Sequence, residues 1–351
     1  MFLLQIHSKR RVRTVISLLT GIIGAAVFSV MPAKIAGSDA LDASPALERK
    51  AKTLGNRLMS AAAGAAAGGE RAAVNQAADA TIDFLLPGVG SEAPGWLQRT
   101  EFEWSLREDN KPDWSILTVQ PLYQSLMQTD TVFTQISALR NHPFGEARTT
   151  TNLGIGYRRL LFNDTIMVGA NSFFDHEWQR DHSRIGLGAE ARWNNFDFYA
   201  NYYNAISGTK FEVHPNTTEK ALDGYDGEIA SQIPYLPSAR VRAKFYHYDV
   251  TSASDLDGWS AGIEVDLHQN LQLEFGIDDD DSSSEKWFLR VRFLPASPYR
   301  PVLLRRNPID SVAFRPRNMR EQTLSKVRRE NEITVQRTIT VRGSVTISRG
   351  T

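Results

Sequence analysis

The feature that most constrains this chain is a two-residue alternation of apolar and polar side chains between Gly154 and Trp193. From Arg184 to Trp193, one face is apolar, and the intervening positions carry arginine, glycine or glutamate. Successive side chains of a β-strand point to opposite faces, so the segment predicts strands with one apolar and one charged face. This pattern is typical of a membrane barrel, where one face meets lipid and the other a wet interior.

Similar alternation over residues 100–293 predicts an all-β, antiparallel, up-and-down transmembrane barrel of about twelve strands. No segment beyond the N-terminal stretch is apolar enough for a spanning helix, and lipid cannot satisfy an open sheet edge, so the barrel must close. The segments fit the ~9–11 residues that a tilted membrane strand requires. They are residues 100–107, 113–123, 130–139, 149–159, 165–173, 182–193, 196–204, 222–232, 239–249, 257–267, 270–279 and 284–293.

The connections between these segments alternate in length. Short ones lie at residues 160–164, 194–195, 233–238 and 268–270, and longer polar ones at 140–148, 175–181, 207–221, 249–257 and 278–284. Outer-membrane barrels combine short periplasmic turns with longer external loops. A soluble antiparallel protein with one polar face is the alternative, but it has no reason to keep this alternation.

The two faces of the barrel can be assigned from the alternation. Outward, lipid-facing candidates are Phe102, Trp104, Leu106, Trp259, Ala261, Ile263, Val265, Leu267, Leu271, Leu273, Phe275, Ile277, Trp287, Leu289, Val291 and Phe293. Charged candidates for the lumen are Glu101, Glu103, Glu190, Arg192, Arg240, Arg242, Glu264, Glu274, Arg290 and Arg292. Tyrosines and tryptophans near strand ends suit the aromatic girdles of such barrels.

The first 40 residues have the composition of a signal peptide. Basic residues from Lys9 to Arg13 precede the apolar stretch Val15–Val30, and Ser38-Asp39-Ala40 resembles a cleavage site. A retained anchor is the alternative, although about 16 residues is short for a spanning helix. Residues 41–95 are predicted to be an Ala-rich, partly helical periplasmic extension that ends in a linker.

The segment 296–351 is strongly basic, with 12 Lys or Arg against 4 Asp or Glu. Met319–Asn331 has a helix-forming composition, and Ile333–Ser348 alternates as a strand or hairpin would. We hypothesise that this tail enters the lumen and plugs it, with its arginines neutralising lumen carboxylates. Those carboxylates would be Glu103, Glu190, Glu264 and Glu274. A periplasmic tail, or a strand that pairs with a separate partner, is the alternative. The tail lacks interleaved aromatics, so no nucleic acid is expected.

No catalytic, cofactor or metal site is predicted. The run Phe173–His176 with Asp181-His182 offers ligand atoms, but zinc needs three or four converging ligands, and no other histidine is placed to complete the set. A Ser–His pair of the kind that an outer-membrane lipase needs does not stand out. The acidic stretch Asp278–Asp281 is interpreted as a solvated loop, although calcium bridging to lipopolysaccharide would also suit it. With no cysteine in the chain, disulfides are excluded.

Three ordered motifs carry a family resemblance: Leu153–Tyr157, Val168–His176 and Arg184–Glu190. Residues 96–295 resemble the β-domain of inverse autotransporters, the intimin/invasin type. The motif positions are Gly154, Gly156, Tyr157, Gly169, Asn171, Phe173, Phe174, Asp175, His176, Arg184, Gly186, Leu187, Gly188 and Glu190.

The resemblance implies type V secretion by a twelve-stranded barrel in the outer membrane of a Gram-negative bacterium. It also implies assembly by the barrel-assembly machinery and periplasmic chaperones, contact with outer-membrane lipid and lipopolysaccharide, and a C-terminal segment that passes back through the pore. The family displays immunoglobulin-like adhesion domains, but residues 296–351 are too few for one domain of ~100 residues. We therefore expect a non-enzymatic translocator that anchors and displays its own short tail, with a link to adhesion. A small pore, or a structural barrel for a separately encoded partner, is the alternative.

Overall fold

The computed structural model describes residues 99–351, apart from 109, 215, 252, 282, 295–300, 305–307, 342–343 and 351. The predicted signal peptide (1–40) and Ala-rich extension (41–95) lie outside the described residues. No described helix is both long enough and apolar enough to cross a membrane.

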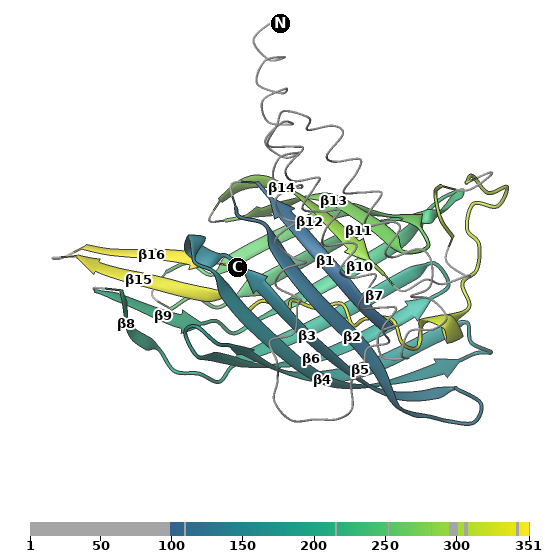
Figure 1. The fold of residues 1–351 in the computed structure, drawn as a ribbon, viewed down its shortest axis with the longest axis horizontal. Helices are drawn as coiled ribbons and strands as arrows, with labels where there is room; N and C mark the ends of the chain where they lie inside the picture. Colours follow the sequence, from purple (N-terminus) through teal and green to yellow (C-terminus); the bar gives the residue numbers. More distant parts are fainter. Residues whose placement is uncertain are drawn as a thin grey trace, which may run out of the picture. The chain divides into compact units, whose positions relative to one another are not determined.

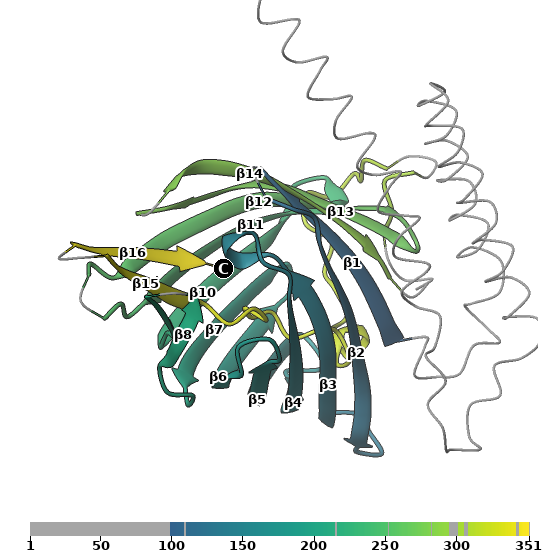
Figure 2. The same cartoon turned by 60° about the vertical axis from the view of Figure 1, so that its left-hand side comes forward.

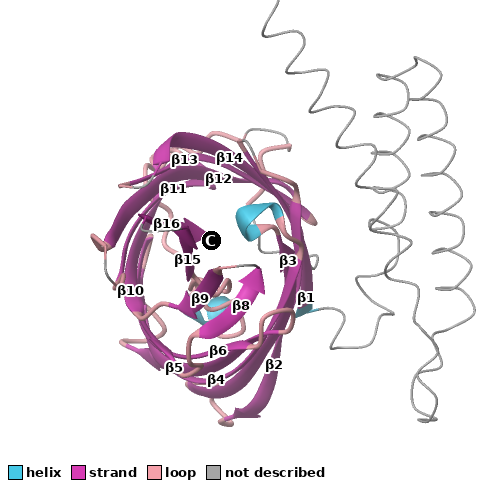
Figure 3. Ribbon diagram, turned by 90° about the vertical axis from the view of Figure 1, so that its left-hand side faces the viewer, coloured by secondary structure: helices cyan, strands magenta, loops and turns pink. Residues whose placement is uncertain are grey.

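Twelve antiparallel strands close into a barrel, which confirms the predicted fold (Figure 3). Strand β1 pairs with β14 from Phe102↔Phe293 to Arg107↔Phe288 and completes the ring. The barrel strands are β1 (Thr100–Arg107), β2 (Asp113–Gln124), β3 (Asp130–Asn141), β4 (Arg148–Leu161), β5 (Ile166–Glu177), β6 (His182–Trp193), β7 (Phe196–Ala205), β10 (Gly224–Ile233), β11 (Leu236–Tyr248), β12 (Leu256–His268), β13 (Leu271–Asp280) and β14 (Ser283–Phe293).

The barrel has two different ends, as the connection lengths predict. Tight turns such as residues 162–165, 194–195, 234–235 and 269–270 gather at one end, here called the turn end. Longer connections, such as residues 142–147 and 249–255, gather at the other, the loop end. The predicted long connections at 175–181 and 278–284 are wrong in length, because only residues 178–181 separate β5 from β6 and only residues 281–282 separate β13 from β14. Asn194 adopts a positive φ of 52° in its two-residue turn, a conformation that asparagine tolerates well in hairpins.

A second sheet lies at the loop end and was only half predicted (Figures 1 and 2). Its order is β16-β15-β9-β8, and it joins β8 (Lys210–His214) and β9 (Thr217–Ala221) to β15 (Val335–Val341) and β16 (Ser344–Gly350). The tail hairpin agrees with the alternation after Ile333. The β8–β9 hairpin lies within the connection 207–221, where no strand was predicted.

The alternation of side chains separates a lipid-facing surface from a charged interior. Leu153 and Leu187 are 57% and 55% exposed on the outside, whereas Arg158 and Arg184 are fully buried inside. Buried arginines are tolerated because carboxylates on neighbouring strands pair with them. The barrel interior is therefore largely polar and most apolar strand residues face outward, although Leu117, Val119, Phe133 and Phe173 form an apolar cluster inside.

The prediction of a helix at Met319–Asn331, made from composition, is wrong. A 3₁₀ turn, η3 (Met319–Gln322), is the only helical element in that segment, and the residues after it are irregular. The reason is tertiary: the barrel wall hydrogen-bonds to the tail carbonyls, which an α-helix would use itself. A second short turn, η2 (Pro143–Gly145), lies in the β3–β4 connection.

Candidate functional site in the barrel interior

The tail first follows the rim of the barrel at the turn end. Its backbone and side chains contact one strand end or turn after another, moving from β12 toward β4. The contacts are Leu303 N to Asp266 O (2.8 Å), Asp310 N to Tyr235 O (2.8 Å), Arg317 Nε to Asn194 O (2.7 Å) and Met319 N to Asp164 O (3.2 Å). These contacts bring residue 319 to the mouth of the lumen.

From there the tail runs through the barrel interior and reaches the loop end (Figure 1, yellow). Side chains of β4, β6 and β7 donate hydrogen bonds to its carbonyl oxygens along the way. These are Arg158 to Thr323 (2.9 Å) and Ser325 (2.6 Å), Asn201 to Arg328 (3.0 Å), Arg184 to Glu330 (2.7 Å) and Asn152 to Asn331 (3.0 Å). Beyond them, Leu222 N donates to Thr334 O, and β15 pairs with β9. Side chains thus satisfy backbone groups that a strand would satisfy by pairing.

Alternate residues of the tail face opposite walls. Val327 packs with buried apolar residues of β2, β3 and β5, and its N–H donates to Gln135 Oε1 (2.7 Å). Lys326, Arg328 and Glu330 reach the other wall, where they pair with Glu101, Glu264 and Lys244 respectively. One side of the tail is thus seated on β2–β7, and charges on its other side span the lumen.

Arg329 occupies a fitted site, here called the Arg329 pocket. Its guanidinium pairs with both carboxylate oxygens of Asp175, at 2.9 and 2.6 Å. It lies 4.2 Å from the ring centroid of Phe173 and 5.5 Å from that of Tyr203. A Cβ at Gly186 would come within 2.8 Å of the guanidinium, so glycine leaves the necessary room. Bidentate pairing and cation–π contact together select arginine.

The predicted motif residues divide by face. Of those on the lumen wall, Phe173, Asp175 and Gly186 contact Arg329, whereas Glu190 pairs with Arg158 and Arg192 and Gly156 makes room for Phe133. Gly154 makes room for the Phe173 ring, because a Cβ there would come within 2.2 Å of it. The lumen set is Gly154, Gly156, Gly169, Asn171, Phe173, Asp175, Arg184, Gly186, Gly188 and Glu190, and the outward set is Tyr157, Phe174, His176 and Leu187.

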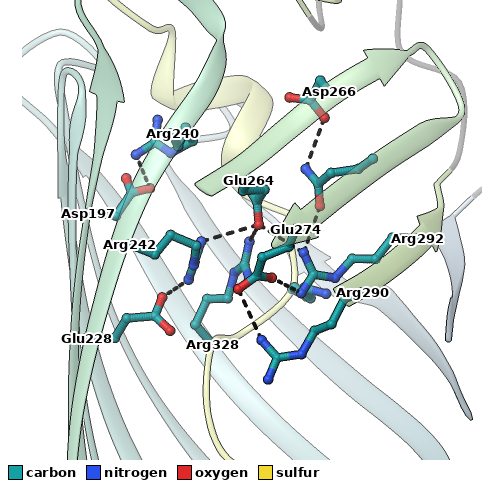
Figure 4. A network of polar contacts seen from close by, with 12 residues as sticks. Asp197, Glu228, Arg240, Arg242, Glu264, Asp266, Glu274, Arg290, Arg292 and Arg328 are labelled. Carbon is teal, nitrogen blue, oxygen red and sulfur yellow. Dashed lines mark hydrogen bonds and ion pairs between the residues drawn. The ribbon is translucent and has the colours of Figure 1, made fainter. Parts of the chain in front are cut away.

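The predicted lumen charges lie inside the barrel, where most pair with charges on the same or nearby strands, and Glu101 and Glu264 pair with the tail; Figure 4 shows those around Glu264 and Glu274. The pairs are Glu101–Lys326, Glu103–Arg292, Glu190–Arg158, Glu190–Arg192, Arg240–Asp197, Arg242–Glu264, Glu264–Arg328, Glu274–Arg290 and Glu274–Arg292.

The hypothesis that tail arginines neutralise four lumen carboxylates needs correction. Arg328 pairs with Glu264 at 2.5 Å, and Lys326 lies 4.0 Å from Glu103. Among the described contacts, Glu190 and Glu274 pair instead with arginines of the barrel strands. The barrel fold places these partners beside each carboxylate: Glu274 of β13 pairs with arginines of the adjacent strand β14, and Glu190 of β6 pairs with Arg192 on its own strand and with Arg158 on β4.

A buried charge cluster fixes the tail at the loop end. Glu219 of β9 accepts from Arg148 at 2.8 Å and from Arg337 of the tail at 2.6 Å, and His182 Nε2 lies 3.5 Å away. Burial alone would raise the pKa of Glu219, but the nearby His182 imidazole and hydrogen bonds from Arg148 and Arg337 hold it well below its usual range. Glu219 was not predicted from the sequence because it lies in a long connection, where the apolar–polar alternation of the barrel strands does not show which side chains face inward.

The histidines considered for metal binding do not converge. His176 faces outward and hydrogen-bonds to Ser183, whereas His182 is fully buried beside Glu219. Among the described residues, one group of ligand atoms lies within 4.8 Å of one another, that of His247, Asp249 and Asp255. His247 already hydrogen-bonds to Asp257 at 2.7 Å.

Sequence comparison agrees with this architecture. The family model of the inverse autotransporter β-domain matches residues 51–331. An attaching and effacing protein homolog of Escherichia coli K12 is 31% identical over 39% of this chain and 44% of its own length. Invasin of Yersinia enterocolitica is 26% identical over 49% of this chain and 20% of its own. Intimin of E. coli O111:H- is 27% identical over 49% of this chain and 18% of its own length. The chain thus covers less than half the length of these relatives.

Structural comparison supports the same fold. A structure from a study of in-meso crystallization of membrane proteins aligns with a TM-score of 0.54 and 18% identity. The alignment covers 68% of this chain and 99% of that one. The family is one of non-enzymatic barrels of the outer membrane. The match over residues 51–331, the closed barrel and the motif-built lumen together show that this chain belongs to the inverse autotransporter β-domain family and resides in the outer membrane.

Proposed function

We propose that the barrel anchors its own C-terminal segment and holds it across the outer membrane. The turn end faces the periplasm, the loop end faces the cell surface, and the β15–β16 hairpin is displayed there. The observation that carries this proposal is the line of hydrogen bonds that follows the tail from Asp164 through Arg184 to Leu222. It fits one register of the tail, because successive stretches meet different donors: Arg158 binds the carbonyls of residues 323 and 325, and Asn201, Arg184 and Asn152 bind those of residues 328, 330 and 331.

The Arg329 pocket gives this arrangement its direction and its stopping point. A tail shifted by one residue would place Arg328 or Glu330 against Asp175. It would also turn charged side chains toward the apolar cluster that Val327 contacts. A bidentate buried pair also resists withdrawal, since breaking it leaves Asp175 without one of its cations. The tail is therefore threaded and then retained.

The proposal extends to a role in adhesion and to contacts with lipid, lipopolysaccharide and the assembly machinery. Relatives named intimin and invasin support a role at the cell surface, and the displayed hairpin is the part of this chain that would serve it. Lipid and lipopolysaccharide would surround the apolar outer face, and the assembly machinery and chaperones of the family would deliver the barrel.

The absence of cysteine allows a direct test by labelling with a membrane-impermeant maleimide. Thr340→Cys places a thiol on an exposed residue of β15. Asp181→Cys reports the loop end, and Leu126→Cys reports the turn end. We expect intact cells to label the first two and to label Leu126→Cys only after the outer membrane is breached. Protection of Thr340→Cys alongside labelling of Asp181→Cys would contradict tail display.

A further inference from the structure

The tail fills only one side of the lumen. Its backbone is bound to β4, β6 and β7, and two cavities remain between it and the opposite wall. One, of 170 Å³, lies toward the loop end beside residues 326–332 and is lined by strands β1–β3 and β10–β14. The other, of 640 Å³, lies toward the turn end and reaches Arg317 and Gln322. Both cavities are lined by Lys326 and Arg328.

Ion pairs join the linings of the two cavities where they meet (Figure 4). Glu228 and Arg292 line the loop-end cavity, and they pair with Arg242 and Glu264, which line the turn-end cavity. Arg328 lines both and pairs with Glu264. Side chains joined by ion pairs therefore lie between the two cavities, beside tail residues 326–328.

The charges at this boundary are balanced. Four arginines and four glutamates meet there, and Lys326 with its partner Glu101 adds one charge of each sign, so the formal sum is zero. The arginines are Arg242, Arg290, Arg292 and Arg328, and the glutamates are Glu103, Glu228, Glu264 and Glu274. Seven of these eight side chains belong to the barrel, and Arg328 alone among them belongs to the tail.

We infer that the barrel keeps a path for hydrated monovalent ions beside the tail, and that Arg328 closes it. This inference rests on the proposed function, because it takes the tail to be seated in the lumen. Asn201 of β7 binds the backbone carbonyl of Arg328 on one wall. The Arg328 side chain extends from there to Glu264 on the opposite wall. Glu264 keeps Arg242 and Arg292 when Arg328 is removed, so the wall survives while the crossing side chain is lost.

The charge balance fixes the sign of the selectivity that each variant acquires. Arg328→Gln leaves a net charge of −1 at the constriction and favours K⁺, since rings of carboxylates select cations. Glu264→Gln leaves +1, releases Arg328 from its partner, and favours Cl⁻. The double variant restores neutrality without the ion pair, so it conducts with little preference.

Planar-bilayer recordings of the purified full chain under a KCl gradient test this inference. We expect severalfold higher conductance in Arg328→Gln than in the unsubstituted chain, with reversal potentials of opposite sign in Arg328→Gln and Glu264→Gln. Arg320→Gln is the matched control, because it removes a tail arginine that pairs with Asp164 outside both cavities. Conductance in Arg328→Gln equal to that of the unsubstituted chain, or reversal potentials of the same sign in the two single variants, would overturn the inference.

Two further measurements separate this inference from the proposed function. A chain lacking residues 319–351 gives the conductance of an unoccupied lumen, and Arg328→Gln should remain well below it. Labelling of Thr340→Cys in the Arg328→Gln background reports whether the tail is still displayed. If labelling is retained and the conductance is unchanged, the ion path is refuted and the proposed display of the tail stands. If labelling is lost and the conductance equals that of the truncated chain, the tail has left the lumen, and gating by Arg328 is refuted.

Discussion

At the scale of single residues, the pairing of Asp175 with Arg329 explains much of the 173–176 motif. Strand parity places Phe173 and Asp175 on the lumen wall, and this could be predicted from the sequence alone. Their partner could not, because Arg329 lies 154 positions away and no local pattern singles it out from its neighbours. The motif is therefore best understood as one half of a binding site whose other half is in the tail.

Asp175→Ala should destabilise the folded protein more than Arg329→Ala does. Asp175 also pairs with Arg184 at 2.9 Å, so its removal leaves two buried guanidinium groups without it and costs about 3–5 kcal/mol. Arg329→Ala leaves Asp175 with Arg184 and costs about 1.5–3 kcal/mol. Urea unfolding in lipid vesicles measures both. Arg159→Ala, on a half-exposed arginine, is the control, and an equal loss in the control and Asp175→Ala would contradict the assignment.

Gly154→Ala should be destabilising by about 1–3 kcal/mol, because the added methyl overlaps the Phe173 ring. Gly227→Ala should be close to neutral, since the nearest atom to its Cβ lies at 3.8 Å. Adding Phe173→Leu to Gly154→Ala should recover part of the loss, and a double-mutant cycle by urea unfolding measures that coupling. Additive losses in the cycle would show that the ring does not occupy the space above Gly154.

At the scale of elements, membrane strands are predictable and the segments that fill or cover the barrel are less so. The barrel strands must alternate over enough residues to span lipid, so the pattern is long and strict. Strands β8 and β9 have five residues each and no membrane constraint, so their pattern is too short to recognise. Met319–Asn331 has helix-forming residues, but contacts with Arg158, Arg184 and Asn201 override that local preference.

Thr338→Pro should release the tail hairpin while the barrel stays folded. Thr338 is paired on both sides, with Thr218 of β9 and Ile347 of β16, and proline removes a ladder donor. We expect faster trypsin cleavage at the loop end and an unchanged heat-modifiable band on gels. Thr338→Val keeps the N–H and the β-branched shape, so it should resemble the unsubstituted chain. Equal protection of the proline variant would mean that β15 is not held by this pairing.

The docking of β15 should persist in mild acid and weaken only in strong acid. The folded-state pKa of Glu219 is depressed, so its stabilising contribution is complete above its ordinary value of 4.5 and declines as the pH falls below it. Arg148, Arg337 and His182 face this carboxylate. Hydrogen exchange of β15 amides should stay slow from pH 7 to about 5 after correction for the intrinsic rate, and should accelerate below about pH 4. Glu219→Gln should exchange faster at neutral pH and lose this dependence; an identical profile would exclude Glu219 as the cause.

At the scale of the whole molecule, the barrel and its occupant are separate cooperative parts. The ring closes through β1–β14 pairing, and no tail residue takes part in the described barrel ladders. Inside the lumen, from Thr323 to Asn331, barrel side chains bind the tail backbone, and water can replace these side-chain contacts when the tail is absent. A charged, hydrated lumen suits a barrel that must accept a chain and afterwards hold it.

Deleting residues 319–351 should therefore leave a folded barrel with an open lumen. Carboxylates that lose tail partners, such as Glu101 and Glu264, regain water, so the cost of leaving them unpaired is small compared with that in a dry core. We expect the heat-modifiable band to persist and single-channel conductance to rise far above that of the full chain. A folded barrel with unchanged conductance would exclude the tail as the obstruction, and loss of the folded band would show that the tail is needed to form the barrel itself.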